Sequence, residues 1–275
     1  MPAISNRGPL QTINGLRGHL RGTMSRSCGG AARVGTSDHD APGKPGSSGA
    51  ITPDELQEII PNLGGRAATL TLYLNIGLRE AEVSHRLGTA MFIAQTAHES
   101  DDFKTLEEKG GTILFSKKNF PNAAQPDDLR HDYFFIMYDK DSPASNRRKV
   151  AATLGNTEPG DGKTFRGRGY IQLTGRSNYR NAGQALGLDL ENHPDQAAQP
   201  ANAARIAGWF WKKNKLNQFT YGDTPENFIS LTKRINGGTV GLEHRVRLFV
   251  RAKHALGIQS RDIFDERLSS TTLWA

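Results

Sequence analysis

The distribution of aromatic residues divides this chain of 275 residues near residue 50. The first fifty residues contain no phenylalanine, tryptophan or tyrosine, and the first aromatic side chain is Tyr73. The same stretch holds ten glycines, four prolines and six serines, so it has too little apolar surface to offset the entropy lost on ordering. We therefore predict a disordered basic tail with a Gly/Pro/Ser linker over residues 1–50, one folded domain over 51–258 and a C-terminal tail over 259–275.

The charge balance and the cysteine content limit the environment and the partners of the protein. Lys and Arg number 35 against 28 Asp and Glu, which gives a net charge of +7. Such an excess suggests an acidic partner, either nucleic acid, a membrane surface or an anionic cell-wall polymer. Cys28 is the one cysteine, which excludes an intramolecular disulfide. There is no apolar run of a secretory signal and none of the roughly 18 residues that a membrane span needs, so we expect cytoplasmic synthesis without a signal peptide.

Helical signals dominate the sequence after residue 51. Thr52 fits an N-cap, Pro53 the first helical position and Glu55 the third position of a capping box. Apolar residues at helical spacing predict further helices over Ala67–Ile76, Thr89–His98, Asp127–Tyr138, Ser142–Leu154, Ser177–Leu186, Asn202–Lys213, Pro225–Ile235 and Gly241–Leu256. Gly169–Thr174 is a candidate for a short extended segment. The sequence therefore predicts a mainly α-helical domain with long, turn-rich loops.

Glu99 ends a run of apolar residues that is predicted to form a buried helix. A carboxylate at that end faces the negative pole of the helix dipole, and partial burial adds to this effect. Both disfavour the charged form of a carboxyl group, which suits a general acid that must hold its proton near neutral pH. A solvated helix end, where glutamate is common, is the alternative interpretation.

Glu107 and Glu108 follow a pair of aspartates, Asp101 and Asp102, which favour the end of the helix. The chain would then turn back and present a second carboxylate across a cleft from Glu99. Two carboxylates about 5–10 Å apart are the groups that hydrolyse glycosidic bonds. Glutamate pairs on exposed loops are also common, so the spacing alone leaves both interpretations open.

Other catalytic and cofactor motifs do not fit this sequence. The zinc motif H-E-x-x-H would need a histidine at position 102, which is aspartate, so we expect His98 to be structural. The stretch Gly167-Arg-Gly169 lacks the third glycine of a dinucleotide-binding loop. Neither a G-x-S-x-G motif nor a P-loop is present. We therefore expect no metal and no cofactor.

Two further segments carry groups that suit a polar ligand. Phe165–Tyr179 reads Phe-Arg-Gly-Arg-Gly-Tyr-Ile-Gln-Leu-Thr-Gly-Arg-Ser-Asn-Tyr, in which glycines let the backbone approach closely and polar side chains offer hydrogen bonds. Ile235–Thr239 reads Ile-Asn-Gly-Gly-Thr and precedes the basic helix predicted over Gly241–Leu256. Each segment is equally explained as a glycine-rich turn that leads into a helix.

Taken together and in this order, these segments resemble the family 19 glycoside hydrolases, the plant-type chitinases and their relatives among phage endolysins. The matching pieces are Ala97-His-Glu-Ser100, Leu106-Glu-Glu108, Phe165-Arg-Gly-Arg-Gly-Tyr-Ile-Gln-Leu-Thr-Gly175, Asn178-Tyr179 and Ile235-Asn-Gly-Gly238. The likeness spans about residues 85–256. It implies a two-lobed, mainly α-helical, lysozyme-like fold with a central substrate cleft, and an inverting mechanism.

The resemblance also implies roles for individual residues. Glu99 takes the place of the general acid and Glu108 that of the general base, for which Glu107 is the rival because a slip of one residue exchanges them. Thr174 matches the hydroxyl residue that orients the attacking water. The positions that bind sugar are matched by Gln172, Asn178, Tyr179 and Asn236. Arg245 matches an arginine that braces the acid.

Some differences from the plant enzymes favour the endolysin branch and peptidoglycan as the substrate. The plant enzymes have disulfides and secretion signals, whereas this chain has one cysteine and no signal. Thr239 stands where the plant members carry an acidic residue, and Ser100 stands where many chitinases have threonine. We therefore expect hydrolysis of the glycan strands of bacterial peptidoglycan, after the protein leaves the cytosol through a holin pore or by lysis.

The positive charge agrees with this substrate. Residues 202–256 contain ten Lys or Arg against three acidic residues, and peptidoglycan with its attached polymers is anionic while chitin is neutral. A solvated helical face or a weak contact with acidic lipid would also explain the charge. Hydrolysis of chitin and lytic transglycosylation, which needs only one carboxylate, are the alternative reactions. We expect no nucleic-acid partner, because aromatics do not alternate with the basic residues, and we expect a monomer.

Overall fold

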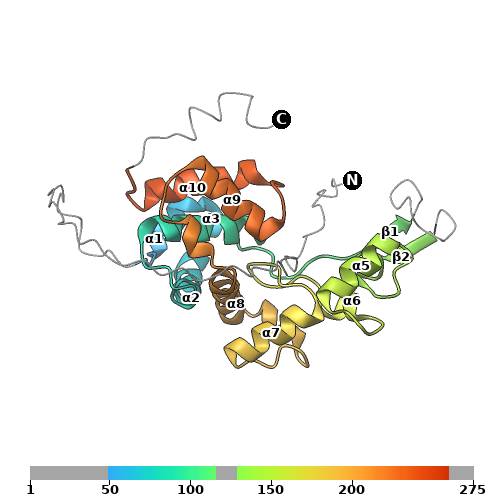
Figure 1. Ribbon diagram of the computed structural model, residues 1–275. Coiled ribbons are helices and arrows are strands. Elements are labelled where there is room, and N and C mark those ends of the chain that lie inside the picture. The colour runs from blue at the N-terminus through green and yellow to red at the C-terminus, as the bar shows by residue number, and fades with distance from the viewer. Residues whose placement is uncertain (1–48, 116–128, 260–275) are drawn as a thin grey trace, which may run out of the picture.

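The computed structural model describes residues 49–115 and 129–259, which are mainly α-helical as predicted (Figure 1). The elements are α1 (Pro53–Ile59), η1 (Pro61–Leu63), α2 (Arg66–Glu80), α3 (Arg86–Glu99), β1 (Thr112–Phe115), β2 (Leu129–Asp132), α4 (Tyr133–Tyr138), α5 (Ser145–Leu154), α6 (Asp161–Thr164), α7 (Arg176–Leu186), η2 (Pro194–Ala198), α8 (Pro200–Lys213), η3 (Leu216–Phe219), α9 (Pro225–Asn236) and α10 (Leu242–Ala255). The predicted tails, with Cys28, lie outside the described residues except for positions 49, 50 and 259.

Contact with the folded domain begins at Gly49, two residues before residue 51, where the domain was predicted to start. Gly49 is buried, and Ile51 exchanges two hydrogen bonds with Asn75, from N to Oδ1 at 2.9 Å and from Nδ2 to O at 2.8 Å. The predicted capping box follows: the Thr52 side chain accepts from the backbone N–H of Glu55, and the Glu55 carboxylate accepts from that of Thr52. These short-range bonds set the start of α1.

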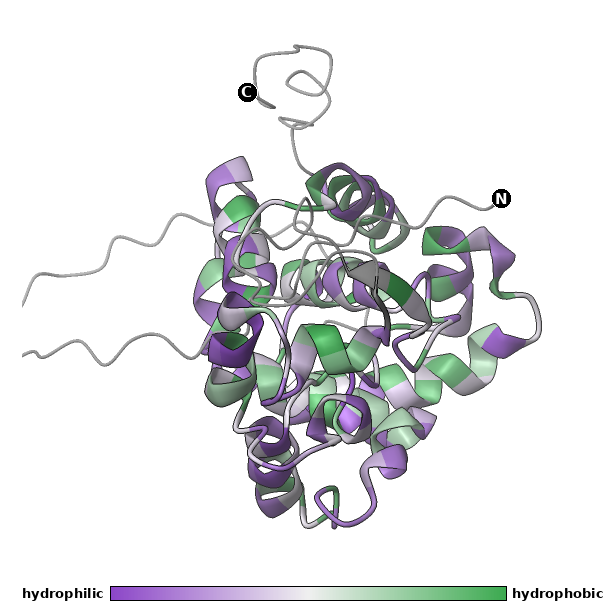
Figure 2. Cartoon of the chain, turned by 90° about the vertical axis from the view of Figure 1, so that its right-hand side faces the viewer, coloured by the Kyte–Doolittle hydropathy of each residue, from purple (hydrophilic) through white to green (hydrophobic). Residues whose placement is uncertain are grey.

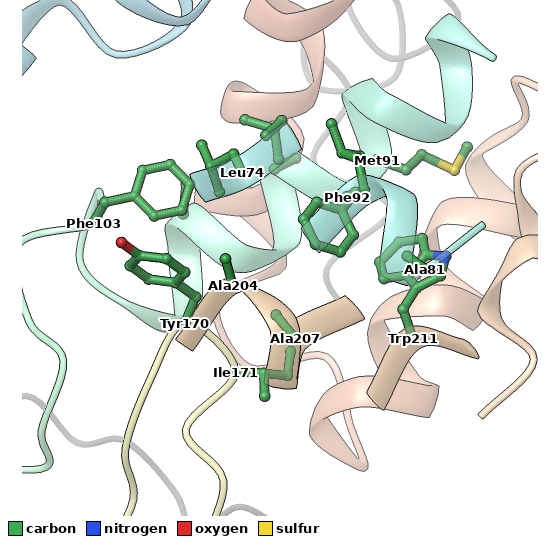
Figure 3. Close-up of a cluster of buried hydrophobic side chains, with 14 of the residues drawn as sticks. Leu74, Ala81, Met91, Phe92, Phe103, Tyr170, Ile171, Ala204, Ala207 and Trp211 are labelled. Carbon is green, nitrogen blue, oxygen red and sulfur yellow. The ribbon is translucent and has the colours of Figure 1, made fainter. Parts of the chain in front are cut away.

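The larger lobe packs around α3, whose side chains are buried along most of its length. Helix α10 lies against α3, and α8 lies against α2. Phe92 of α3 meets Trp211 of α8 edge to face, with ring centroids 5.2 Å apart (Figure 3). Phe103, just beyond α3, meets Tyr170 in the same manner at 5.2 Å. The core therefore holds the C-terminal end of α3, where Glu99 lies, between several packed elements.

A second, smaller hydrophobic core belongs to the part of the chain that holds the hairpin and the short helices. Helix α4 packs on α5 and α6, at the right of Figure 1. The buried members of this core are Phe134, Ile136, Met137, Tyr138, Ala144 and Leu154. Because the two cores are separate, the described chain is two-lobed, as the resemblance implied.

The helix predicted over Asp127–Tyr138 is wrong over Leu129–Asp132, and its first two residues lie outside the described ranges. Leu129–Asp132 is a β-strand that pairs antiparallel with Thr112–Phe115, with Thr112 opposite Asp132. In the described part of this range only Tyr133–Tyr138 is helical, because the Asp132 side chain caps the backbone N–H groups of the next turn and starts α4 there. The partner strand lies too far back in the sequence for a helical pattern to reveal the pairing.

The remaining predicted helices are present with ends shifted by a few residues. The expected extended segment at Gly169–Thr174 is mostly a turn, in which Gln172 has a φ of 51°. Around this segment, β-type pairing is limited to two isolated antiparallel bridges. They join Arg168 to Glu107 on one side and to Leu173 on the other. These bridges bring the segment with the second glutamate against the glycine-rich loop.

The surface helices are amphipathic. Figure 2 shows hydrophilic residues beside hydrophobic ones along the outer helices. In α7 the buried residues are Tyr179, Ala182, Gly183 and Leu186, which recur at helical spacing. In the described ranges, no helix combines the length and the hydropathy needed to cross a membrane.

Candidate active site

Glu99 is the last residue of α3 and is only 5% exposed. Its Oε1 accepts a hydrogen bond from Nη2 of Arg245, which lies on α10 and is 1% exposed. Within the described residues the carboxylate has no other hydrogen bond, so Oε2 is left for a ligand. The core of the larger lobe thus holds a buried ion pair whose carboxylate offers one oxygen.

Arg245 is held from a second side by Gln95, one turn before Glu99 on α3. Nη1 of Arg245 donates to Oε1 of Gln95 at 2.5 Å, and Nε2 of Gln95 donates to Oγ1 of Thr232 at 2.9 Å. Gln95 and Thr232 have no exposed surface. A continuous buried polar chain therefore joins α9, α3 and α10 at Glu99.

The chain reverses direction immediately after Glu99. Asp101, Asp102 and Phe103 have φ angles of 52°, 55° and 60°, in the left-handed region that non-glycine residues rarely adopt. The contact of Phe103 with Tyr170 and a hydrogen bond from the Asp102 N–H to the Ala97 carbonyl hold this turn. The strained turn sends the chain back toward the glycine-rich loop, as the two aspartates predicted.

Glu108 is fixed at both its backbone and its carboxylate. Its N–H donates to the Gly167 carbonyl at 2.8 Å, and its Oε2 accepts from the Gly167 N–H at 3.1 Å. Its Oε1 accepts from the hydroxyls of Tyr133 at 3.1 Å and Tyr138 at 2.9 Å, both on α4 of the smaller lobe. Three donors therefore surround one carboxylate.

The two tyrosines keep their protons at neutral pH. Burial and then the negative charge of Glu108 raise the pKa of Tyr133 to about 12. The same two causes raise the pKa of Tyr138 well above its ordinary value. Since a protonated tyrosine donates through its hydroxyl, both residues act as neutral hydrogen-bond donors to Glu108.

Glu107, the rival for the base, has different partners. Its carboxylate binds Arg166 Nη2 at 2.9 Å and Arg168 Nε at 2.9 Å. Burial raises the pKa of Glu107, but the hydrogen bonds and charges of the two arginines outweigh it and hold the pKa below its ordinary value. Glu107 is thus occupied on both oxygens by ion pairs, whereas Glu108 is bound by neutral donors.

Gln172 and Thr174 lie beside Glu108. A Cβ atom added to Gly167 would be 2.8 Å from Gln172 Oε1, 3.1 Å from Glu108 Oε2 and 3.3 Å from Thr174 Oγ1. Three oxygens therefore converge on one point next to the backbone of Gly167. The Thr174 hydroxyl donates to the Gln172 carbonyl at 2.9 Å, which leaves its lone pairs to accept.

The other predicted contact residues differ in exposure. Asn178 is half-buried and donates to the Thr174 carbonyl at 2.8 Å. Asn236, the last residue of α9, is half-buried and donates to the Val240 carbonyl at 3.3 Å, across the loop that leads to α10. Both side chains shape the loops on which they lie.

Tyr179 does not fit the sugar contact that the resemblance implied. It has no exposed surface, and its hydroxyl donates to the Arg166 carbonyl at 2.7 Å while accepting from Arg168 Nη1 at 3.0 Å. A side chain without exposed surface does not touch a polymer. Tyr179 instead stabilises the glycine-rich loop through its hydrogen bonds to Arg166 and Arg168, the two arginines that bind Glu107.

The histidine before Glu99 bonds to another histidine. Nδ1 of His98 lies 2.9 Å from Nδ1 of His244 on α10, and Nε2 of His244 is 3.8 Å from Oδ1 of Asp102. Burial lowers the pKa of His244, which outweighs the nearby carboxylate. Over residues 49–115 and 129–259, no group of three His, Cys, Asp or Glu side chains is arranged to hold a metal ion.

Comparison with known proteins places this arrangement in a family. A family model described as chitinase class I matches residues 75–223, more than half of the chain, and this range contains both glutamates and the glycine-rich loop. The chain belongs to the family 19 glycoside hydrolases. It is therefore a glycoside hydrolase, as the motifs predicted.

Individual relatives of this family 19 chain come from bacteria and plants. A family 19 glycosyl hydrolase domain-containing protein of Haemophilus influenzae is 30% identical over 174 residues, 62% of this chain and 82% of that protein. An Arabidopsis thaliana endochitinase is 45% identical over 117 residues, 42% of this chain and 39% of that protein. Chitinase C from Streptomyces griseus HUT6037 aligns at 22% identity with a TM-score of 0.47, over 75% of this chain and 76% of that one.

Three residues of this family 19 site were not predicted from the sequence. Gln95 carries a signal, since it is a polar residue four positions before Glu99 and follows the apolar run Ala90–Ala94. Tyr133 and Tyr138 bracket an apolar run, and only the pairing of the two lobes shows that both hydroxyls meet Glu108.

Proposed function

We propose that this family 19 glycoside hydrolase cleaves the glycan strands of bacterial peptidoglycan by an inverting mechanism with two glutamates. The observation that carries the proposal is the contrast between the two carboxylates. Glu99 is buried with one oxygen taken by Arg245, and Glu108 is surrounded by two hydroxyls and a backbone N–H. Distinct environments for two carboxyl groups are what separate an acid from a base in this chemistry.

In the proposed reaction, Glu99 is the general acid and protonates the glycosidic oxygen through Oε2. Glu108 is the general base and takes a proton from the water that attacks the opposite face of the sugar ring. Glu108 Oε2, Gln172 Oε1 and Thr174 Oγ1 are grouped beside Gly167, and oxygens gathered in this way can accept and orient the protons of this water. Gln172, Asn178 and Asn236 then bind the sugars on either side.

Charge supports peptidoglycan as the polymer. Residues 202–256 carry ten Lys or Arg against three acidic residues. Arg247, Arg251 and Lys233 are among those exposed to solvent, on α9 and α10. An anionic wall polymer, or weakly an acidic lipid surface, would be attracted to these helices. We propose that the protein acts as a monomer on the wall after its release from the cytosol by a holin pore or by lysis.

Chitin is the second candidate substrate, and the names of the relatives favour it. The plant relative is an endochitinase, and the aligned bacterial structure is a chitinase. Lytic transglycosylation is a weaker alternative, because that reaction needs one carboxylate and would leave the donors around Glu108 without a purpose.

Analysis of the products by mass spectrometry tests the proposal. Purified peptidoglycan and colloidal chitin are digested side by side with the full-length protein. New reducing ends from peptidoglycan, at a rate well above that from chitin, are expected. Faster turnover of chitin would replace the proposed substrate, and anhydro-muramic ends would replace hydrolysis by transglycosylation. The Glu99→Gln variant serves as the inactive control for both polymers.

A further inference from the structure

Arg245 is a buried cation whose orientation must be set by neighbouring side chains. It is 1% exposed, and a buried guanidinium is tolerated only when its charge and its N–H groups find partners. Nη2 binds Glu99 and Nη1 binds Gln95, while Nε has no hydrogen-bond partner among the described residues. Two contacts, to Glu99 and to Gln95, therefore define how the guanidinium lies.

The amide of Gln95 has one orientation that satisfies both of its neighbours. Its oxygen accepts from Arg245, and its nitrogen donates to Thr232 Oγ1 at 2.9 Å. Rotation of the amide by 180° would turn its NH₂ group toward the guanidinium, where two sets of donors would oppose each other. Thr232 therefore fixes the amide oxygen toward Arg245.

Gln95 and Glu99 contact the same cation from the same helix. Residues four apart lie on one face of an α-helix, so both side chains of α3 reach Arg245 on α10. A shift of the guanidinium away from Gln95 would change which oxygen of Glu99 it covers. The free oxygen of Glu99 is then defined by Gln95, although Gln95 is fully buried and touches no substrate.

We propose that Gln95 is a positioning residue, which aligns Arg245 so that Oε1 of Glu99 is covered and Oε2 is presented to the glycosidic oxygen. This inference rests on the proposed acid role of Glu99. Thr232 contributes to the same alignment, because its hydroxyl accepts from Gln95 Nε2 and fixes the orientation of the Gln95 amide. The proposed role of Gln95 is the same for either polymer. The variants are therefore tested on whichever polymer the wild-type enzyme hydrolyses faster.

Steady-state kinetics of buried-site variants test the proposal. Gln95→Met keeps the length of the side chain but removes the acceptor, and we expect kcat to fall about 10- to 100-fold with KM within about twofold, since a misplaced catalytic group can cost this much. Gln95→Glu restores an acceptor for Arg245, so it should recover at least about tenfold of that loss. Its extra negative charge, facing Arg245 and Glu99, should also move the loss of activity at alkaline pH to a higher pH.

Thr232→Val is the milder variant, for use if Gln95→Met does not fold. It leaves Gln95 in place and unlocks the amide, so kcat should fall about three- to tenfold by a smaller misplacement of the same groups. Thr96→Val is the matched control: Thr96 is also fully buried, on the same helix, and its hydroxyl donates to two carbonyls of that helix, those of Phe92 at 2.7 Å and Ile93 at 3.3 Å. It should lose thermal stability but keep its kcat.

Several results would overturn the inference. A folded Gln95→Met enzyme with wild-type kcat, or one that changes only KM, would show that Gln95 does not position the acid. An equal loss of kcat in Thr232→Val and Thr96→Val would assign the effect to general destabilisation. Glu99→Gln distinguishes failure of the acid role of Glu99 from failure of the positioning role of Gln95. If Glu99→Gln keeps its turnover, the proposed acid role fails. If Glu99→Gln is inactive while Gln95→Met keeps wild-type activity, only the role of Gln95 fails.

Discussion

Glu99 and Glu108 are nine residues apart in the chain, and their carboxylates have opposite kinds of partner. Glu99 ends a buried helix of the larger lobe and pairs with a charged guanidinium. Glu108 lies on an extended segment and accepts hydrogen bonds from neutral groups, two of which belong to the smaller lobe. One residue type thus meets two environments, and this difference is the basis of the proposed roles of Glu99 as the acid and Glu108 as the base.

Glu99→Gln should have the largest effect on activity. Glutamine keeps an oxygen for Arg245 but cannot give up a proton as an acid, so we expect the rate of reducing-end release to fall by about 10²- to 10⁴-fold. Sedimentation with insoluble cell wall should show unchanged binding, because the charge of the basic helices is untouched. Turnover within about tenfold of wild type would contradict the acid role.

Glu108→Gln and Glu107→Gln form a matched pair that tests which neighbour is the base. Glu108→Gln should lower kcat about 100-fold or more, since it removes the group that accepts the proton of water. Glu107→Gln leaves Glu108 and its three donors intact and should lower kcat less than about tenfold. If the two losses were exchanged, Glu107 would be the base and the ion pairs with Arg166 and Arg168 would have to open during the reaction.

Loss of either tyrosine hydroxyl should lower kcat less than loss of the Glu108 carboxylate to which both hydroxyls donate. Tyr133→Phe and Tyr138→Phe each remove one donor from Glu108 Oε1, and we expect each to lower kcat about three- to tenfold, a loss equivalent to one hydrogen bond. The double variant should lose less than the product of the two, because both hydroxyls act on one oxygen. Tyr170→Phe, in the core of the larger lobe, is the control and should leave kcat unchanged.

The smallest expected effect concerns the stability that Glu107 supplies. Its pKa is lowered in the folded protein, because the hydrogen bonds and charges of Arg168 and Arg166 outweigh the effect of burial, so its ion pairs stabilise the fold above the unfolded value near 4.5. That contribution is lost as the pH falls through the lower folded pKa. With 42% of the side chain exposed, Glu107→Gln should lower the Tm by only about 1–3 °C at pH 7.

Thermal unfolding at several pH values measures this effect. The difference in Tm between wild type and Glu107→Gln should shrink as the pH is lowered below about 4.5. A difference that stays constant down to pH 3 would mean that the arginines do not stabilise the ionised carboxylate.

Signals that lie within one helix turn were sufficient to predict much of the fold. Thr52 and Glu55 satisfy each other three residues apart, and the predicted capping box is present. The apolar run before Glu99 and the aspartates after it predicted the end of α3, which is where the structure has it. In each case the residues that decide the conformation are close neighbours in the chain.

Features that depend on distant residues were missed. The strand at Leu129–Asp132 exists because it pairs with Thr112–Phe115, and a periodicity within twelve residues does not contain that partner. The burial of Tyr179 and the clamp of Tyr138 on Glu108 likewise follow from how separate segments pack. The motif identified the segments of the site, but it could not distinguish a residue that faces the ligand from one that supports it.

The absence of a side chain at Gly167 has a practical consequence. A single methyl group there would lie within 3.3 Å of oxygens from Glu108, Gln172 and Thr174, yet it would remove no charge and no catalytic group. Gly167→Ala is therefore a route to a silenced enzyme that keeps every ionisable group of the natural protein. Such a protein would serve as a labelled probe of the polymer, which reports where the enzyme binds on a cell surface without digesting it.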